Sequence, residues 1–301
     1  GVDRSQLAAL EGWSTLISSC EREFIVNGLD HGIRMDGRQR LESRNIQLKV
    51  GTVPSCYGSA SVHCGGTKAI ASVQAELSDT GAEGSGASVE VSVTCSNMPS
   101  SAGRQAEDMS AALTADANRI FARPIPTLIK SLMVSDRHAW KLFVDVMLVE
   151  YDGCLLDVVS IAVWAALSDT KLPTLSTFTN ADGSVGVELS LEMEEKNKKP
   201  LDLSSVPTYV SITQVGKHFI ADATAIEEAC AGCRISYAIN ARNEVCCIHK
   251  SEGRGLKPTQ IVSTMGAATQ FGSNRMKFLD KKLQDLIDKD SGDDLLDRDV
   301  L

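Results

Sequence analysis

The segment from Trp140 to Leu167, WKLFVDVMLVEYDGCLLDVVSIAVWAAL, constrains the fold of this chain more than any other part. Its first half is rich in apolar and β-branched residues, which is typical of a strand that is buried on at least one face. Asp152 and Gly153 supply a turn, and the residues from Leu155 onward are almost continuously apolar, as in a helix that a core surrounds. A strand, a tight turn and a buried helix predict the centre of a domain built from sheets and helices.

The turn in this segment is a place where several phosphate-binding enzymes hold an anion. Backbone amides at a helix N-terminus favour negative charge, and a hydroxyl or guanidinium group in the first helical positions strengthens the binding. Here these positions are Cys154, Leu155 and Leu156, followed by the anionic Asp157. None of these side chains would attract an anion.

The chain before this segment predicts a helix, an antiparallel meander and a second helix. The first helix is expected over residues 14–27, with Gly28 as its stop. A loop rich in Gly, Ser and Ala (78–87) and a short segment around 132–134 complete this part. The expected strands and second helix are 44–50, 59–64, 68–76, 89–94 and 103–121.

The chain after this segment predicts a second group of strands that a helix follows. A hairpin is expected at 175–179 and 185–191, and the charged residues 192–207 are interpreted as a linker. The later strands and the last helix are expected at 209–215, 217–223, 234–240, 245–250 and 258–288. Because strands followed by a helix occur twice, we predict an α+β fold of two similar halves packed together. The predicted parts are a helical extension (1–27), two halves (28–200 and 201–288) and a solvated acidic tail (289–301).

Net charge and cysteine content limit the classes of function. The net charge of −9 has the wrong sign for a protein that grips nucleic acid over a broad surface by itself. No apolar run reaches the roughly 18 residues of a membrane span, so no membrane partner is expected. Nine cysteines, an odd number, predict reduced thiols, and Cys230, Cys233, Cys246 and Cys247 are interpreted as buried thiols rather than a zinc site. No metal and no cofactor are predicted.

The order and spacing of several motifs resemble the ribonuclease PH family. The likeness covers roughly residues 20–285. Its motifs are Arg34-x-Asp36-Gly37-Arg38, Tyr57-Gly58-Ser59-Ala60-Ser61-Val62, Gly66-Thr67-Lys68-Ala69-Ile70, Gly103-Arg104-Gln105-Ala106-Glu107, the central segment, and Asp222-Ala223-Thr224 followed by Glu227-Glu228-Ala229-Cys230.

This resemblance implies the ribonuclease PH fold, which is similar to domain 2 of ribosomal protein S5. Within the family, the chain is most similar to eukaryotic subunits of the RNA exosome ring. The resemblance therefore implies a hexameric ring of ribonuclease PH-like subunits, S1/KH-type cap subunits, an associated hydrolytic exoribonuclease and RNA as partners. It also implies a location in the nucleus, nucleolus and cytoplasm, with a role in rRNA processing and RNA degradation.

The resemblance also marks positions that correspond to the phosphorolytic site of active relatives. Leu155 and Leu156 stand where those relatives carry hydroxyl or arginine residues, and Asp222 and Glu228 match two aspartates six residues apart. If these two carboxylates are to meet, the chain must bend between them. The alternative interpretation is that Asp222 caps its own turn while Glu227 and Glu228 face solvent or a neighbouring subunit.

Arginines provide the remaining candidates. Arg104 matches an RNA-contacting arginine of relatives, and Arg137 is a second candidate for RNA binding. Both could instead be surface or interface residues. Arg34 and Arg38 are expected to tie the N-terminal turn down through forked hydrogen bonds.

The sequence favours a non-catalytic structural subunit of the exosome ring, with Asp222, Glu228, Leu155 and Leu156 as vestigial site positions. The alternative is a phosphate-dependent 3′–5′ exoribonuclease that is active as a ring. A weaker third hypothesis is an independent RNA-binding module, which the acidic balance disfavours.

Overall fold

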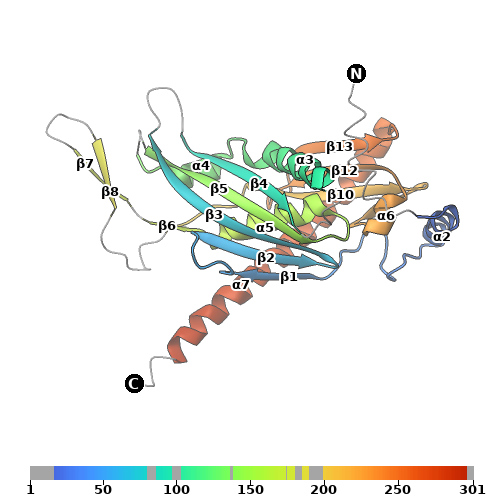
Figure 1. The fold of residues 1–301 in the computed structure, drawn as a ribbon, viewed down its shortest axis with the longest axis horizontal. Helices are drawn as coiled ribbons and strands as arrows, with labels where there is room; N and C mark the ends of the chain where they lie inside the picture. Colours follow the sequence, from blue (N-terminus) through green and yellow to red (C-terminus); the bar gives the residue numbers. More distant parts are fainter. Residues whose placement is uncertain are drawn as a thin grey trace.

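Two β-sheets form the body of the protein in the computed structural model, which describes residues 17–79, 86–96, 103–135, 138–173, 175–179, 185–189 and 199–296. A five-stranded sheet has the order β1-β2-β3-β5-β4, and a four-stranded sheet has the order β11-β10-β12-β13. Figure 1 shows the first sheet in front and the second to its right. The α+β class predicted from the sequence is confirmed.

The first sheet combines the predicted meander with one parallel pair. Its strands are β1 (Ile46–Val50), β2 (Gly58–Cys64), β3 (Thr67–Asp79), β4 (Ser88–Cys95) and β5 (His138–Glu150). Strands β1, β2, β3 and β5 pair antiparallel in turn, whereas β4 pairs parallel to β5, with Cys95 beside Leu148. The C-terminal ends of β4 and β5 therefore lie side by side at one end of the sheet, where the chain turns from β5 into α5.

Helix α5 (Leu155–Asp169) lies between the two sheets, packed on β2 and β3 on one side and on β10 on the other. Every residue from Leu156 to Leu167 is buried, including Val159 and Ala165, which are fully enclosed. A helix with no polar face suits a position between two apolar layers. The predicted buried helix at the centre of the domain is confirmed.

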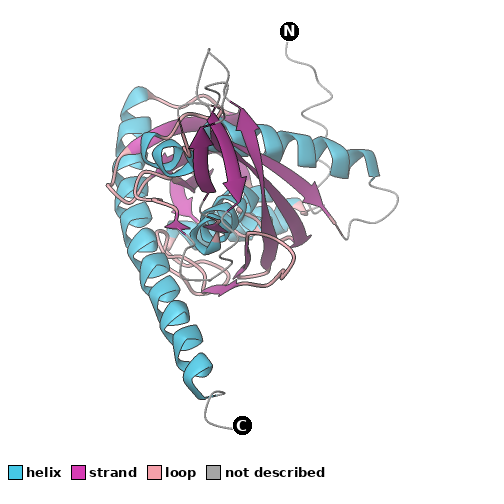
Figure 2. Ribbon diagram, turned by 90° about the vertical axis from the view of Figure 1, so that its left-hand side faces the viewer, coloured by secondary structure: helices cyan, strands magenta, loops and turns pink. Residues whose placement is uncertain are grey.

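The second sheet is antiparallel and carries the C-terminal helix. Its strands are β10 (Thr208–Val215), β11 (His218–Ala221), β12 (Ala231–Ile239) and β13 (Val245–Gly253), and α6 (Ala225–Ala229) lies between β11 and β12. Helix α7 (Pro258–Leu296) packs on β10 and β12. Figure 2 shows α7 running along one side of the molecule and past its body. It continues beyond the predicted end at 288, so part of the segment interpreted as a solvated tail is helical.

Helix α3 (Gly103–Phe121) agrees with the predicted helix and covers the outer edge of β4. Ser110, Thr114 and Asn118 lie four residues apart on one face of α3, and they accept hydrogen bonds from successive outward-facing amides of β4. Helix α4 (Pro126–Leu132) follows and was not predicted, since the short segment expected around 132–134 begins only where α4 ends. Its Pro at the first helical position suits a helix start.

Helix α2 (Ser19–Asp30) differs from its predicted limits. Its start is fixed by a capping box, in which the Ser18 side chain accepts from the Glu21 amide and Glu21 bonds back to Ser18. The prediction that Gly28 ends the helix was wrong, because the helix continues to Asp30. Residues 14–16 of the predicted helix lie outside the described residues.

The segment interpreted as a linker is partly packed. Strand β6 (Lys171–Leu172) pairs with β9 (Lys199–Pro200), and β7 (Leu175–Thr179) pairs with β8 (Val185–Leu189) as the predicted hairpin. Leu201 and Leu203 pack against the main core and Val206 is fully buried, so the latter part of 192–207 is not a free linker. The division of the chain at residue 200 stays a prediction. No helix in the described ranges is both long and apolar enough to cross a membrane.

Candidate functional site

The turn between β5 and α5 has an unusual backbone. Gly153 has φ +76°, and a Cβ atom there would lie 2.4 Å from the carbonyl oxygen of Ala223, so only glycine fits. The next residue, Cys154, also has a left-handed φ of 51° and precedes α5 without a side-chain cap. A left-handed non-glycine residue is sparsely populated, and its surroundings must hold it in place.

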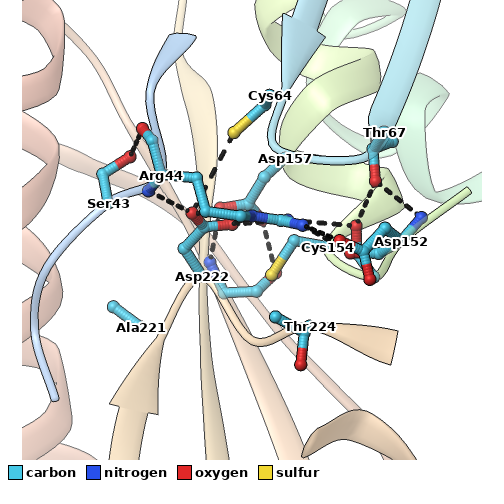
Figure 3. Close-up of polar contacts among 12 residues, drawn as sticks. Ser43, Arg44, Cys64, Thr67, Asp152, Cys154, Asp157, Ala221, Asp222 and Thr224 are labelled. Atoms are coloured by element: carbon cyan, nitrogen blue, oxygen red, sulfur yellow. Dashed lines mark hydrogen bonds and ion pairs between the residues drawn. The ribbon is translucent and has the colours of Figure 1, made fainter. Parts of the chain in front are cut away.

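Arg44 connects three segments around this turn (Figure 3). Its Nη1 donates to the carbonyl oxygen of Asp152 at 2.5 Å, and its Nη2 donates to Asp222 Oδ1 at 2.8 Å. The backbone amide of Arg44 donates to Asp222 Oδ2 at 2.7 Å. The fork of the guanidinium group therefore ties the segment before β1 to the β5–α5 turn and to the end of β11.

Asp222 is buried, and its carboxylate is paired with arginine side chains. Besides Arg44, it accepts a hydrogen bond from Arg38 Nη1 at 3.2 Å. Burial alone would raise the pKa of Asp222, but the hydrogen bonds and charge of Arg44 outweigh burial and hold the pKa below its ordinary value. The interpretation that Asp222 caps its own turn was wrong, because the donors to its carboxylate come from Arg38 and Arg44.

The chain bends sharply after Asp222, as the sequence required if Glu228 was to approach the same site. Asp222 has φ 49°, and α6 begins three residues later. Glu228 Oε1 accepts hydrogen bonds from the backbone amide of Cys154 and from Arg234 Nη1, both at 3.0 Å. The chain's own carboxylate thus bonds to the amide that immediately precedes α5.

Glu227 does not face solvent, and that prediction was wrong. Its side chain is 2% exposed and forms a forked pair with Arg34, from Nε to Oε1 at 2.9 Å and from Nη2 to Oε2 at 2.7 Å. It also closes a capping box with Thr224 at the start of α6. The predicted structural role of Arg34 and Arg38 is confirmed by these bonds.

The first residues of α5 turn toward the protein interior. Leu156 is 4% exposed in the main core, and Leu155 packs against the same core. Asp157 is buried on a different side, where it accepts from Ser211 and pairs with Arg275 Nη1 at 3.0 Å. Burial raises the pKa of Asp157 despite Arg275. Leu155 and Leu156 therefore pack into the core, and they present neither a cationic nor a hydroxyl side chain to the turn.

The two candidate RNA-binding arginines differ in what the structure describes. Arg104 is exposed on the first turn of α3, which begins beyond the C-terminal end of β4, and it pairs with no other described residue. Arg104 therefore lies at the end of the sheet where β5 passes into α5. Arg137 falls outside the described residues.

The cysteines of the described residues are reduced thiols. All nine cysteines lie in the described ranges and none forms a disulfide. Cys230 and Cys233 are buried as predicted, but the interpretation of the other two as buried thiols was wrong, because Cys246 is exposed and Cys247 is only partly buried. Burial raises the pKa of the Cys154 thiol well above its ordinary range and that of Cys64 to about 12, so neither thiol supplies an anion at neutral pH. Within the described residues, no three His, Cys, Asp or Glu side chains gather as metal ligands would.

Arg44 and Arg234 were missed by the sequence interpretation. Arg44 is 178 residues from Asp222 in the chain, and no local pattern marks it as the partner. The pairing of Glu228 with Arg234 had a weak signal, because an arginine on an otherwise apolar strand predicts a specific partner.

Comparisons with known proteins place this geometry in a family. Two family models match the chain, "3' exoribonuclease family, domain 1" at residues 42–173 and "3' exoribonuclease family, domain 2" at residues 205–270. A Dictyostelium discoideum protein named "Putative exosome complex exonuclease RRP42" is 26% identical over 90% of this chain and 98% of its own length. "Exosome complex component RRP45" of Bos taurus is 29% identical over 82% of this chain, which spans 56% of that protein.

Solved structures share the fold. A chain of an "Archaeal exosome core" matches with a TM-score of 0.67 and 19% identity, over 93% of this chain and 99% of its own. At this identity the likeness establishes the fold alone. The two family matches together cover more than half of the sequence, and this chain therefore belongs to the 3′ exoribonuclease family, the ribonuclease PH family that its motifs resemble.

Proposed function

We propose that this protein is a non-catalytic structural subunit of an RNA exosome ring. The observation that carries the proposal is the hydrogen bond from the Cys154 amide to Glu228 at the start of α5. In phosphorolysis an inorganic phosphate attacks the terminal phosphodiester of RNA. Such a reaction brings two anions together, and the site must supply positive charge and free donors to hold them.

The residues around the turn offer little to an incoming phosphate. The side chains of Leu155 and Leu156 have no donor, and Glu228 places a negative charge against the Cys154 amide. The Arg234 guanidinium also bonds to Glu228, so its charge is already paired with that carboxylate. Repulsion by the Glu228 carboxylate opposes phosphate binding at the Cys154 amide.

The first of the two carboxylates that match aspartates of active relatives, Asp222, is also engaged. Asp222 receives donors from Arg44 and Arg38, which hold its pKa below the ordinary range. A general acid or base at neutral pH needs a pKa near 7 and a free oxygen facing the substrate. The bonds of Asp222 serve instead to fix the β11–α6 turn.

The names of relatives support the proposed assembly. Proteins similar to this chain are named components of the exosome complex, and one similar solved structure is described as an Archaeoglobus fulgidus exosome with RNA bound to the active site. We propose that this chain forms a hexameric ring with other ribonuclease PH-like subunits. S1/KH-type subunits would cap the ring, and RNA would pass through it, contacting Arg104, to an associated hydrolytic 3′–5′ exoribonuclease.

The proposed role places the protein in the nucleus, nucleolus and cytoplasm, in rRNA processing and RNA degradation. Fluorescent tagging of the full chain checks this location. Exclusion from the nucleus would contradict it.

The proposal is tested by substituting Asp222→Asn and Glu228→Gln together in the assembled complex. Both substitutions keep side-chain size and remove the charge. We expect the rate of 3′–5′ RNA decay to stay within about twofold of the unaltered complex, because the decay is carried out by another subunit. A complex that retains its mass by light scattering but loses decay activity would contradict the scaffold role.

A second arm separates RNA contact from catalysis. Arg104→Glu should weaken crosslinking of RNA to this subunit, whereas Arg119→Glu, at the other end of α3, should leave crosslinking unchanged. Equal crosslinking of both variants and the unaltered chain would remove Arg104 from the RNA path.

A further inference from the structure

One region of the surface concentrates large apolar side chains. Within the part of the chain that the structure describes, four large apolar residues are more than 60% exposed, and three of them are Phe24, Ile33 and Met35. Ile226, on α6, is 44% exposed. These four residues are called the apolar patch below. Single exposed apolar residues are normal on a protein surface, whereas a contiguous group marks an interaction site.

Hydrogen bonds hold the segments that carry the patch against one another. The Ile33 amide donates to the carbonyl oxygen of Gly28, one helical turn after Phe24, at 2.9 Å. Arg22 Nη2, on α2, donates to the carbonyl oxygen of Ala229, the last residue of α6, at 2.8 Å. Figure 1 shows α2 and α6 at the same end of the molecule. The patch therefore spans α2, the loop that follows it, and α6.

A buried ion pair anchors the loop between α2 and β1. Arg34 lies between Ile33 and Met35 in the sequence, and its side chain is fully buried. It forms the forked pair with Glu227, the residue that follows Ile226. Such a pair fixes both partners in one geometry, so the flanking apolar side chains are held outward. A surface that is ordered before it binds loses less conformational entropy on association.

The apolar patch is large enough for a permanent contact. At roughly 200 Å² for a fully exposed large side chain, its four residues together expose on the order of 500 Å². The largest apolar patch on a typical monomer has about 300–600 Å², and each partner in a standard interface buries roughly 800 Å². With the polar residues around it, the patch therefore reaches the size that a stable protein contact needs.

The charges next to the patch favour a protein partner over RNA. Arg34 and Arg38 belong to the anchored loop, but each is paired with a buried carboxylate. The exposed Glu23 directly precedes Phe24. RNA binding requires cations that face the phosphates, and an exposed carboxylate beside the patch opposes it.

We propose that the apolar patch is an interface with a neighbouring ribonuclease PH-like subunit of the ring. The inference rests on the proposed function and names a surface by which this chain enters the assembly. Permanent interfaces are more apolar than transient ones, and each subunit of a closed ring buries such a surface against its neighbours. The neighbour packs apolar side chains against the patch and places a Lys or Arg side chain opposite Glu23.

Site-specific photocrosslinking tests the contact in the assembled complex. Replacing Phe24 by p-benzoylphenylalanine keeps an aromatic side chain at this position and forms a covalent bond to a neighbour on irradiation. We expect mass spectrometry to identify a crosslink to a ribonuclease PH-like subunit. The same replacement of Val262, a similarly exposed residue of α7, is the matched control and should give at least tenfold less of that product. Crosslinks from position 24 only to a cap subunit or to RNA, or no crosslink, would overturn the inference.

Substitution of the loop tests whether assembly needs the patch. Ile33→Asp with Met35→Asp should weaken copurification of the neighbouring subunit at least tenfold, whereas Val262→Asp should stay within about twofold. Both loop side chains are exposed, so the thermal unfolding of the full chain alone should stay unchanged, and Ile33→Leu with Met35→Leu should assemble normally. A ring that retains the aspartate variant would overturn the inference and leave the scaffold proposal intact. An unaltered chain that joins no ring would overturn both.

Discussion

At the residue scale, single arginines determine how the candidate site is held. Arg44 bonds to Asp222 and to the β5–α5 turn, and Arg34 forms a forked pair with the buried Glu227. These contacts stabilise two turns that contain left-handed non-glycine residues, Cys154 and Asp222. Asp222, one of the two candidate site carboxylates, thus has a structural partner in Arg44.

Arg44→Met is expected to destabilise the protein by about 3–5 kcal/mol, because it leaves the buried Asp222 carboxylate without its main partner. Urea unfolding of the full chain measures the change. The double variant Arg44→Met with Asp222→Asn should recover part of the loss, since it removes the unpaired charge. The exposed Arg242→Met serves as the control and should change stability by less than about 0.5 kcal/mol. Equal effects of the two single arginine variants would contradict the role of Arg44.

The dependence of stability on pH should reveal Asp222. Its pKa is lower in the folded protein than its ordinary value of 3.8, so its contribution is fully present above about pH 4 and is lost as pH falls through the folded pKa. The difference in unfolding free energy between the unaltered chain and Asp222→Asn should be constant from pH 7 to 5 and shrink below about pH 4. Glu23→Gln, at an exposed position, should show no such change. A difference that grows on acidification would contradict the assignment.

At the element scale, periodicity predicted most helices and strands, while their neighbours were beyond prediction. The alternation in β2 and β3 and the apolar run of α5 are local signals, and these elements lie where they were expected. The parallel pairing of β4 with β5 depends on contacts distant in the sequence. The extent of α2 past Gly28 and of α7 past residue 288 was missed, because glycine and acidic residues weaken a helix without ending it.

Helix α3 takes the place of a sixth strand at the edge of β4. Asn118 accepts from the Val91 amide at 2.9 Å and donates to the Val91 carbonyl at 2.7 Å. Asn118→Ala should cost about 1–3 kcal/mol, because both buried backbone groups lose their partners. Thermal unfolding measures the loss, and hydrogen exchange at Val91 should become faster. Gln105→Ala, at an exposed position of the same helix, is the control, and an equal cost there would refute the edge-covering role of Asn118.

At the scale of the whole molecule, two sheets enclose one apolar helix, and the candidate site lies where that helix begins (Figure 1). The resemblance of motifs predicted this arrangement, which the family matches bear out. The bonds of Arg44 and of Glu228 could not be predicted, since they join residues 178 and 74 positions apart. The distinction between a ring subunit that guides RNA and one that cleaves it depends on those bonds.

The most direct test of a non-catalytic role is to follow the fate of labelled inorganic phosphate. The purified chain, alone and in its reconstituted ring, is incubated with RNA, magnesium and ³²P-phosphate, and nucleoside diphosphates are separated by chromatography. We expect no labelled nucleoside diphosphate from either sample, while an active phosphorolytic ring run in parallel releases it. Labelled product that disappears with Asp222→Asn, while the ring stays assembled, would contradict the account.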